Sequence, residues 1–337
     1  MKLPTVKYIL TLLFLTAFCT GFTGKKEVVI YTSVDQIFSE PILKAYEKRT
    51  GVKVKAVYDV EAAKTTGLVN RLLAERKRPR ADVFWNSEVG KTLALQQKGV
   101  LAPYRSPSAR GLPAKFVDKT YYWAGFAARA RVLIYNSSIL AKEQVPRSIF
   151  DLTSEKWRGK VAMAFPLFGT TATHTAALYT SLGQKKAEIY LKALAANNLV
   201  VVNGNSVVRD LVAQGKLPIG FTDTDDVNVA IHRKKPVKMI YPDQNGMGTL
   251  LIPNTVALIK NAPHPNEARK LMDYLLSPEV ESRLSFSTSG NIPLRRGVKK
   301  PPCVPELSSI KTMDVDFYKV AQEMERSALF CRKLFAR

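Results

Sequence analysis

Apolar stretches of two different periods alternate along the N-terminal third of the chain, and this alternation constrains the fold more than any other feature of the sequence. Runs that are typical of strands are each followed by a stretch with the 3.6-residue period of a helix: 27–34 then 37–51, 52–60 then 62–77, and 81–86 then 88–99. The pattern continues through the chain and predicts an α/β fold with mostly parallel sheets. In such sheets ligands bind at the carboxyl ends of the strands, where loops lead into helices.

The length and the charge of the chain restrict its organisation and its partners. A chain of 337 residues is long enough for two domains, and the absence of a repeat or a long linker means that short crossovers must join them. Lys and Arg exceed Asp and Glu by 51 to 28. The basic residues are spread along the whole chain, and their densest run, 76–80, contains no aromatic residue that would stack on a base. We therefore expect a solvated basic surface and no nucleic-acid partner.

The first 24 residues have the pattern of a secretory signal peptide. Lys2 and Lys7 precede an apolar run at 8–18, and small and polar residues follow it. The run has about eleven residues, which is too short for a bilayer span of ~20. We expect cleavage near Gly24 and export of a soluble protein. Lipid attachment at Cys19 is the alternative, although the large Phe18 before it departs from the usual lipoprotein pattern.

Two cysteines, Cys303 and Cys331, remain after removal of the signal peptide. Both lie in the C-terminal tail, and an exported compartment is oxidising enough to preserve a disulfide. The sequence therefore predicts a Cys303–Cys331 disulfide. The alternative is two separate buried thiols, because a chain of this length does not need a covalent link for stability.

Four predicted strand-to-helix junctions carry short hydroxyl, amide or carboxylate side chains: 31–36, 84–90, 165–174 and 220–228. Taken one at a time, each is explained by helix capping, because Ser, Thr, Asn and Asp are the preferred N-caps. Taken together, they come from well-separated parts of the chain and are expected on one side of the sheets. The last junction holds Asp223, Asp225 and Asp226, so the convergence predicts a polar ligand cleft.

The sequence carries no recognisable catalytic constellation. It lacks a Gly-x-Ser-x-Gly elbow and the glycine patterns of nucleotide-binding loops, and its three histidines show no zinc-site spacing. Counted as an EF-hand loop from Asp223, the sixth residue is Asn228 and the twelfth is Lys234, where Gly and Glu would be needed. We therefore expect a binding protein that is not an enzyme and requires no cofactor.

Five segments of this sequence resemble extracellular solute-binding proteins of ABC transporters, of the ferric-iron-binding type: 81–88, 129–140, 148–163, 264–284 and 292–295. The resemblance extends to about Gly297, and "DLTSEKWRGKV" is its most specific piece. It implies two α/β lobes joined by two hinge strands, with crossovers near 122–126 and 249–255. It also implies a monomeric periplasmic protein that delivers a solute to a membrane permease powered by an ATPase.

This resemblance sets the expected domain boundaries. They are residues 1–24 as signal peptide, 25–124 with 254–297 as lobe 1, 125–253 as lobe 2, and 298–337 as a helical tail. Relatives of the iron-binding type hold the metal with a side chain of the first loop, a Glu after the third strand and two adjacent tyrosines. The corresponding positions here are Asp35, Glu88 or its neighbour Ser87, and the pair Thr224 and Asp225. The tyrosines are therefore absent.

Two interpretations of the ligand remain open, and the family resemblance favours the first. In the first, carboxylates hold a hard cation, Fe³⁺ or Ca²⁺, together with a synergistic anion; the metal ligands would be Asp35, Glu88, Asp223 and Asp225. In the second, the ligand is a sugar phosphate, a phosphonate or another anionic solute whose amine or hydroxyls meet the aspartates. The anion would lie at the helix starts that hold Gly169, Thr170, Thr171 and Asn205. The complete set of candidate ligand-binding residues is Ser33, Asp35, Asn86, Glu88, Gly169, Thr170, Thr171, Asn205, Asp223, Thr224 and Asp225.

Two arginines and one aspartate receive subsidiary roles. Arg129 and Arg131 lie close to the first expected crossover and would add positive charge to the site, or else they are solvated at a strand edge. We expect Asp226 to act mainly as a favourable charge at the start of a helix.

Overall fold

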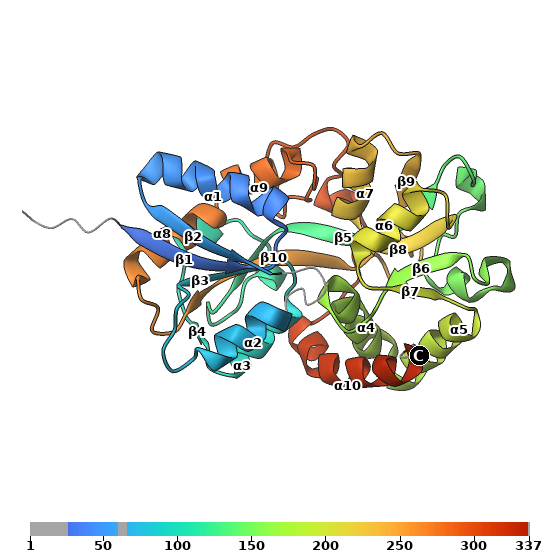
Figure 1. The fold of residues 1–337 in the computed structure, drawn as a ribbon, viewed down its shortest axis with the longest axis horizontal. Coiled ribbons are helices and arrows are strands. Elements are labelled where there is room, and N and C mark those ends of the chain that lie inside the picture. Colours follow the sequence, from blue (N-terminus) through green and yellow to red (C-terminus); the bar gives the residue numbers. More distant parts are fainter. Residues whose placement is uncertain (1–25, 60–65, 336–337) are drawn as a thin grey trace, which may run out of the picture.

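Two sheets that share one long central strand, β5, form the frame of the molecule, which a computed structural model describes over residues 26–59 and 66–335 (Figure 1). The strands are β1 (Glu27–Thr32), β2 (Lys53–Tyr58), β3 (Val83–Asn86), β4 (Leu101–Ala102), β5 (Ala124–Asn136), β6 (Val161–Ala164), β7 (Val200–Val202), β8 (Ile219–Asp223), β9 (Val237–Ile240) and β10 (Leu251–Ile259). Their order is β2-β1-β3-β10-β5-β8-β6-β7, with β4 on β10 and β9 on β5.

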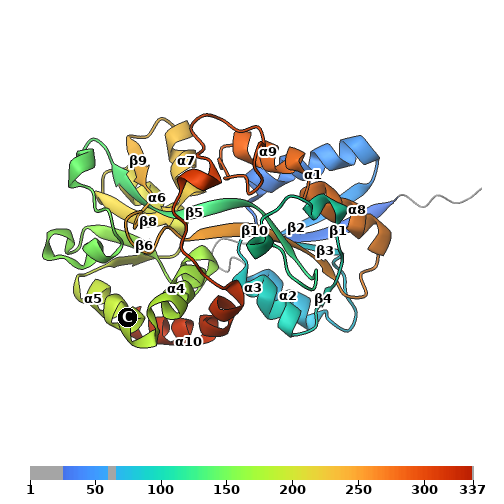
Figure 2. The same cartoon turned by 180° about the vertical axis from the view of Figure 1, so that it is seen from behind.

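Ten helices cover the faces of this frame in the described residues. They are α1 (Gln36–Thr50), α2 (Thr66–Ala74), α3 (Gly90–Gln97), α4 (Gly169–Leu182), α5 (Gln184–Ala196), α6 (Asn205–Ala213), α7 (Thr224–His232), α8 (Pro265–Leu275), α9 (Pro278–Phe286) and α10 (Phe317–Phe335). In lobe 1, α1, α8 and α9 cover one face of the sheet and α2 and α3 the other. In lobe 2, α6 and α7 lie opposite α4 and α5 (Figures 1 and 2). The predicted two-lobed α/β fold is confirmed.

The long strands β5 and β10 connect the two lobes. All thirteen residues of β5 are buried. Its first half pairs antiparallel with β10, from Ala124 opposite Val256 to Ala130 opposite Leu251, and its second half pairs with β8 and β9. In each lobe the strands beyond this pair run parallel to one another, as β1 does to β2 and β3, and as β6 does to β7 and β8.

A β-bulge interrupts the pairing of these two connecting strands. The register shifts between Pro253 and Asn254, so that Ala127 of β5 has no partner residue on β10. Ala127 has a φ of 44°, which is unusual for a residue with a side chain. Pro253 has no N–H to donate to a ladder, and prolines inside sheets are found at bulges for this reason. The molecule therefore has an irregular point in the segment that joins its lobes.

The sequence locates the early elements well but not completely. Gly51 adopts a φ of 70° and ends α1, as the predicted helix over 37–51 requires. The predicted helix over 62–77 is seen as Thr66–Ala74, and its start falls in 60–65, outside the described residues. The predicted signal peptide and Cys19 also lie outside them. No helix of the described chain combines the length and the apolar character needed to span a bilayer.

The C-terminal helix α10 spans the two lobes on the side of α3 and α4 (Figures 1 and 2). At its start, Phe317 joins the lobe 1 core, with its ring centroid 6.3 Å from that of Phe116. Further along, Val320 and Met324 belong to the lobe 2 core. Within the expected helical tail, α10 is the only long helix of the described residues. The preceding segment, 298–316, is irregular apart from a short 3₁₀ turn at Leu307–Ser309 and a bridge between Thr312 and Thr249.

The predicted disulfide is wrong. Cys303 is exposed and Cys331 is buried, and both thiols are free. Cys331 faces the lobe 2 core from the last turns of α10, and burial raises the pKa of its thiol to about 12. The sequence could not show this, because the orientation of a helix in its tertiary environment decides which of its faces is buried.

We expect a chain that begins at Lys25 to expose one reactive thiol when native and two after unfolding without a reductant. Cys303 is accessible, whereas Cys331 is shielded and its raised pKa suppresses the reactive thiolate. Titration with a thiol reagent with and without denaturant tests this. A Cys303→Ser variant serves as the control and should show no native reactivity. A native protein with no reactive thiol would contradict the prediction.

Candidate functional site

A pocket of about 120 Å³ lies between the lobes, and the starts of four helices line it. Lobe 1 contributes the start of α1, with Asp35 before it, and Ser87 of the loop after β3. Lobe 2 contributes the starts of α4, α6 and α7. Helix N-termini present unpaired N–H groups and a partial positive charge. The backbone therefore makes this pocket suitable for an anion.

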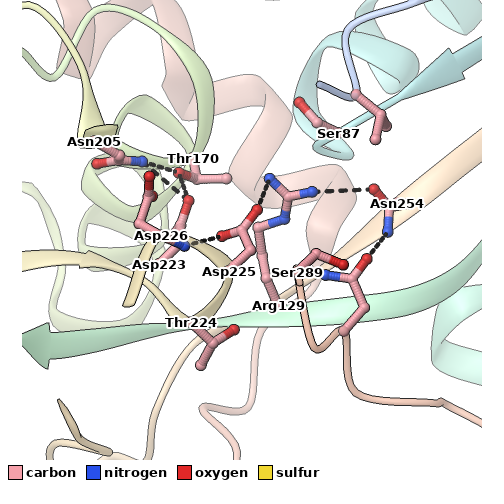
Figure 3. A network of polar contacts seen from close by, with 12 residues as sticks. Ser87, Arg129, Thr170, Asn205, Asp223, Thr224, Asp225, Asp226, Asn254 and Ser289 are labelled. Carbon is pink, nitrogen blue, oxygen red and sulfur yellow. Dashed lines mark hydrogen bonds and ion pairs between the residues drawn. The ribbon is translucent and has the colours of Figure 1, made fainter. Parts of the chain in front are cut away.

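Asp223 ends β8 at the inner wall of the pocket and forms a buried ion pair. Its Oδ1 lies 2.8 Å from Nη1 of Arg131, and the two side chains are 2% and 0% exposed. Its Oδ2 accepts hydrogen bonds from Oγ1 of Thr170 at 2.5 Å and from Nδ2 of Asn205 at 3.0 Å (Figure 3). Asp223 is the N-cap residue of α7, yet its side chain makes no capping hydrogen bond. Its carboxylate therefore ties three lobe 2 segments together.

Asp225 forms a second ion pair, which faces the pocket directly. Its Oδ2 lies 3.0 Å from Nη1 of Arg129, and both side chains are 5% exposed (Figure 3). Burial alone would lower the pKa of Arg129, but Asp225 and then Asp223 raise it above its ordinary value. Arg129 therefore stays charged, and its Nη2 also donates to Oδ1 of Asn254 at 3.2 Å.

The pocket contains cationic and anionic groups in similar number. Arg129, Arg209 and Arg233 line it together with four aspartates, Asp35, Asp223, Asp225 and Asp226. Oxygen atoms of Asp223, Asp225 and Asp226 come within 4.8 Å of one another, which is close enough for a shared cation. The same site thus offers donors for an anion and carboxylates for a cation or an amine.

The structure brings most of the predicted site residues together. Those that line the pocket are Asp35, Gly169, Thr170, Thr171, Asn205, Asp223 and Asp225, with Ser87 as the alternative to Glu88. Arg129 lines the pocket and Arg131 lies behind Asp223, so neither is solvated at a strand edge. Asp226 also lines the pocket, beyond the helix-dipole role that we expected for it.

Four predicted ligand residues lie outside the pocket, because other groups use their polar atoms. Glu88 is fully buried and accepts hydrogen bonds from the N–H groups of Gly90 and Lys91 at the start of α3 and from Thr173. Ser33 donates to Asn86, which in turn donates to the carbonyl of Glu88. The Thr224 hydroxyl accepts from the N–H of Ala130. These side chains support the loops behind the pocket and do not line it.

Sequence reasoning missed several residues that line the pocket, and helical spacing could have found some of them. Arg209 is four residues after Asn205, on the same face of α6. Val229 and Arg233 follow Asp226 by three and seven residues, on the pocket face of α7. The aromatic residues Phe165 and Phe168, before α4, carried no such signal.

Comparisons with known proteins agree with this architecture. The family model described as "Bacterial extracellular solute-binding protein" matches residues 42–312. The chain is 29% identical over 260 residues to a Salmonella typhimurium protein described as "Putative 2-aminoethylphosphonate-binding periplasmic protein", covering 75% of this chain and 73% of that one.

Two solved structures share the fold. Iron-bound HitA from Pseudomonas aeruginosa superposes with a TM-score of 0.83 at 22% identity, covering 92% of this chain and 99% of that one. AfuA from Actinobacillus pleuropneumoniae, with fructose-6-phosphate bound, gives 0.81 at 22% identity, covering 93% and 99%. With a family model that matches most of its length and a ligand-sized pocket between two lobes, this chain belongs to the bacterial extracellular solute-binding proteins.

Proposed function

We propose that this protein captures a small organic phosphonate or phosphate that also carries an amine. The Arg129–Asp225 ion pair carries this proposal, because a guanidinium and a carboxylate lie side by side in the wall of the pocket. A ligand with both charges would meet both partners, with its anion near Arg129 and its ammonium near Asp225. Charge-assisted hydrogen bonds of this kind are stronger than neutral ones.

The surroundings of this ion pair support the same class of ligand. The starts of α4 and α6 supply backbone N–H groups, and Thr171 and Ser206 add hydroxyls for phosphonate oxygens. The Salmonella relative is described by a ligand of this chemistry, and the AfuA structure contains a phosphorylated sugar. The mixed charges of the pocket favour a zwitterion over a simple anion, because an anion alone would leave the carboxylates next to its own charge.

A hard cation such as Fe³⁺, bound with a synergistic anion, is the second candidate ligand. It is favoured by the proximity of Asp223, Asp225 and Asp226 and by the iron bound to HitA. All three of these carboxylates are paired with arginines, and no tyrosine lines the pocket among the described residues. A cation would have to share its ligands with three guanidinium groups, so we place it second.

We further propose that the protein works as the binding component of an ABC importer. The lobes, 25–124 with 254–297 and 125–253, would close on the solute along β5 and β10, and the closed form would bind the permease of an ATP-driven transporter. We propose a periplasmic monomer, released by cleavage near Gly24. The proposal includes no catalytic step and no resident cofactor.

Isothermal titration calorimetry of the protein after unfolding and refolding, which removes co-purified ligand, tests the choice of solute. We expect 2-aminoethylphosphonate to bind at least tenfold more tightly than methylphosphonate or inorganic phosphate, because only the first has an ammonium for Asp225. Fructose 6-phosphate and Fe³⁺ with citrate complete the panel. Tighter binding of Fe³⁺ than of every phosphonate and phosphate would reverse the order of the two candidates.

A further inference from the structure

The side chain of Asn254 lies between the ligand pocket and the bulge in the connecting strands. It is fully buried, on β10, directly after the register shift. Its Oδ1 accepts the hydrogen bond from Nη2 of Arg129 (Figure 3). Its Nδ2 donates to the carbonyl of Ala127 and to Oδ1 of Asn291. One amide group therefore contacts a pocket arginine and the irregular residue of the bulge.

The bulge needs this amide, because Ala127 has lost its ladder partner. Its N–H donates to Oε1 of Glu281 at 3.0 Å, and its carbonyl accepts from Asn254. Buried backbone groups without partners are costly, so the two side chains replace the missing strand pairing. Glu281 is itself held by Arg295 at 2.8 Å. The φ of 44° at Ala127 is thus maintained by side chains that come from outside β5.

The Arg129 guanidinium, which donates to the oxygen of the Asn254 amide, has polar partners on two sides. Asp225 of lobe 2 binds its Nη1, and Asn254 of the connecting strand binds its Nη2. An arginine that loses one of two such partners gains rotational freedom, and a ligand must then restore the order at an entropic cost. The orientation of Arg129 that faces the ligand depends on both contacts.

We propose that Asn254 is a positioning residue. It orients the Arg129 guanidinium toward the solute and couples this orientation to the backbone conformation of the bulge between the lobes. It does not line the pocket, so this role would be exerted through Arg129. A change of backbone geometry at Ala127 moves the carbonyl that the Asn254 amide binds. Because the same amide also binds Arg129, the change alters the position of the guanidinium. The inference rests on the proposed solute site, since it gives Arg129 the role of anion ligand.

The test compares Asn254→Ala, Arg129→Ala and the double variant, with 2-aminoethylphosphonate as the probe. We expect Asn254→Ala to raise Kd about tenfold in the wild-type background and to change it less than twofold in the Arg129→Ala background. Such non-additivity is the sign that one residue acts through the other. Asn254→Ser, a milder change, provides a second variant should the alanine form fail to fold.

Asn197→Ala is the matched control. Asn197 is a buried amide of lobe 2 whose Nδ2 donates to the carbonyls of Leu152 and Ser154, away from the pocket. Its replacement should lower the melting temperature as Asn254→Ala does, but leave Kd unchanged. An equal loss of affinity in the control, or a full Asn254 effect without Arg129, would overturn the proposal.

A second readout needs no ligand. In ¹⁵N-arginine NMR spectra, the Nη groups of Arg129 should give separate signals in the wild type, because both ends are held, and a single averaged signal in Asn254→Ala. The Arg129→Ala spectrum assigns these signals. Failure of 2-aminoethylphosphonate to bind the wild type would refute the proposed function. The NMR signals of Arg129 would then be the remaining test of whether Asn254 positions this arginine. Unchanged signals in Asn254→Ala would overturn that role.

Discussion

Replacing Arg131 by methionine should lower the free energy of unfolding of the ligand-free protein by about 3–5 kcal/mol, because breaking a buried ion pair leaves an uncompensated charge. Arg131 is 0% exposed, and its guanidinium lies 4.4 Å from the ring centroid of Phe221 as well as 2.8 Å from Asp223. Methionine keeps most of the packing but leaves the Asp223 carboxylate buried with only neutral donors.

Urea denaturation of the ligand-free protein measures this effect. Arg158→Met is the control, because Arg158 and its partner Glu155 are 48% and 78% exposed, and such surface pairs contribute ~0.2–1 kcal/mol. The double variant Arg131→Met with Asp223→Asn should recover part of the loss, since it removes both charges. A loss below about 1 kcal/mol in Arg131→Met would mean that Thr170 and Asn205 satisfy Asp223 by themselves.

Replacing Asp225 by asparagine should change which solutes the protein prefers. We expect the Kd for 2-aminoethylphosphonate to rise by about 10- to 100-fold, because a charge-assisted contact is worth ~1.5–3 kcal/mol and tenfold corresponds to ~1.4 kcal/mol. Methylphosphonate has no amine, so it has no contact with Asp225 that the substitution could remove. Its Kd should stay the same or fall, because Arg129 no longer shares its charge with Asp225 and one negative charge has left the pocket.

Calorimetric titration of both ligands into wild type and Asp225→Asn gives the ratio of the two affinities, which is the quantity that matters. Glu155→Gln removes the same charge at a 78% exposed position in lobe 2 and should leave the ratio unchanged. If both ligands lose affinity equally in Asp225→Asn, the carboxylate supports the shape of the pocket and does not recognise an amine.

The sequence predicted the fold and the general position of the site because both follow from local patterns. Apolar periodicity located the strands and helices, and short polar residues at helix starts indicated the pocket. The partners of buried charges were beyond such reasoning. Asp223 is 92 residues from Arg131 and had an adequate local explanation as a helix cap, which the structure does not bear out. Glu88 was assigned to the ligand with Ser87 as the alternative, but its carboxylate accepts hydrogen bonds from the N–H groups at the start of the helix that follows it.

The position of α10 at the end of the chain determines when, during synthesis, this helix can pack on the two lobes. The strand β10 pairs with β3 but is made after β5 to β9, and α10 is made last of all the described elements. A chain still emerging from the ribosome can pair β1, β2 and β3, but it cannot place Phe317 on one lobe and Met324 on the other until its final residues are free. A premature stop near residue 310 would therefore spare all the described strands, and β5 and β10 would still connect the lobes, but the helix that packs on both of them would be lost.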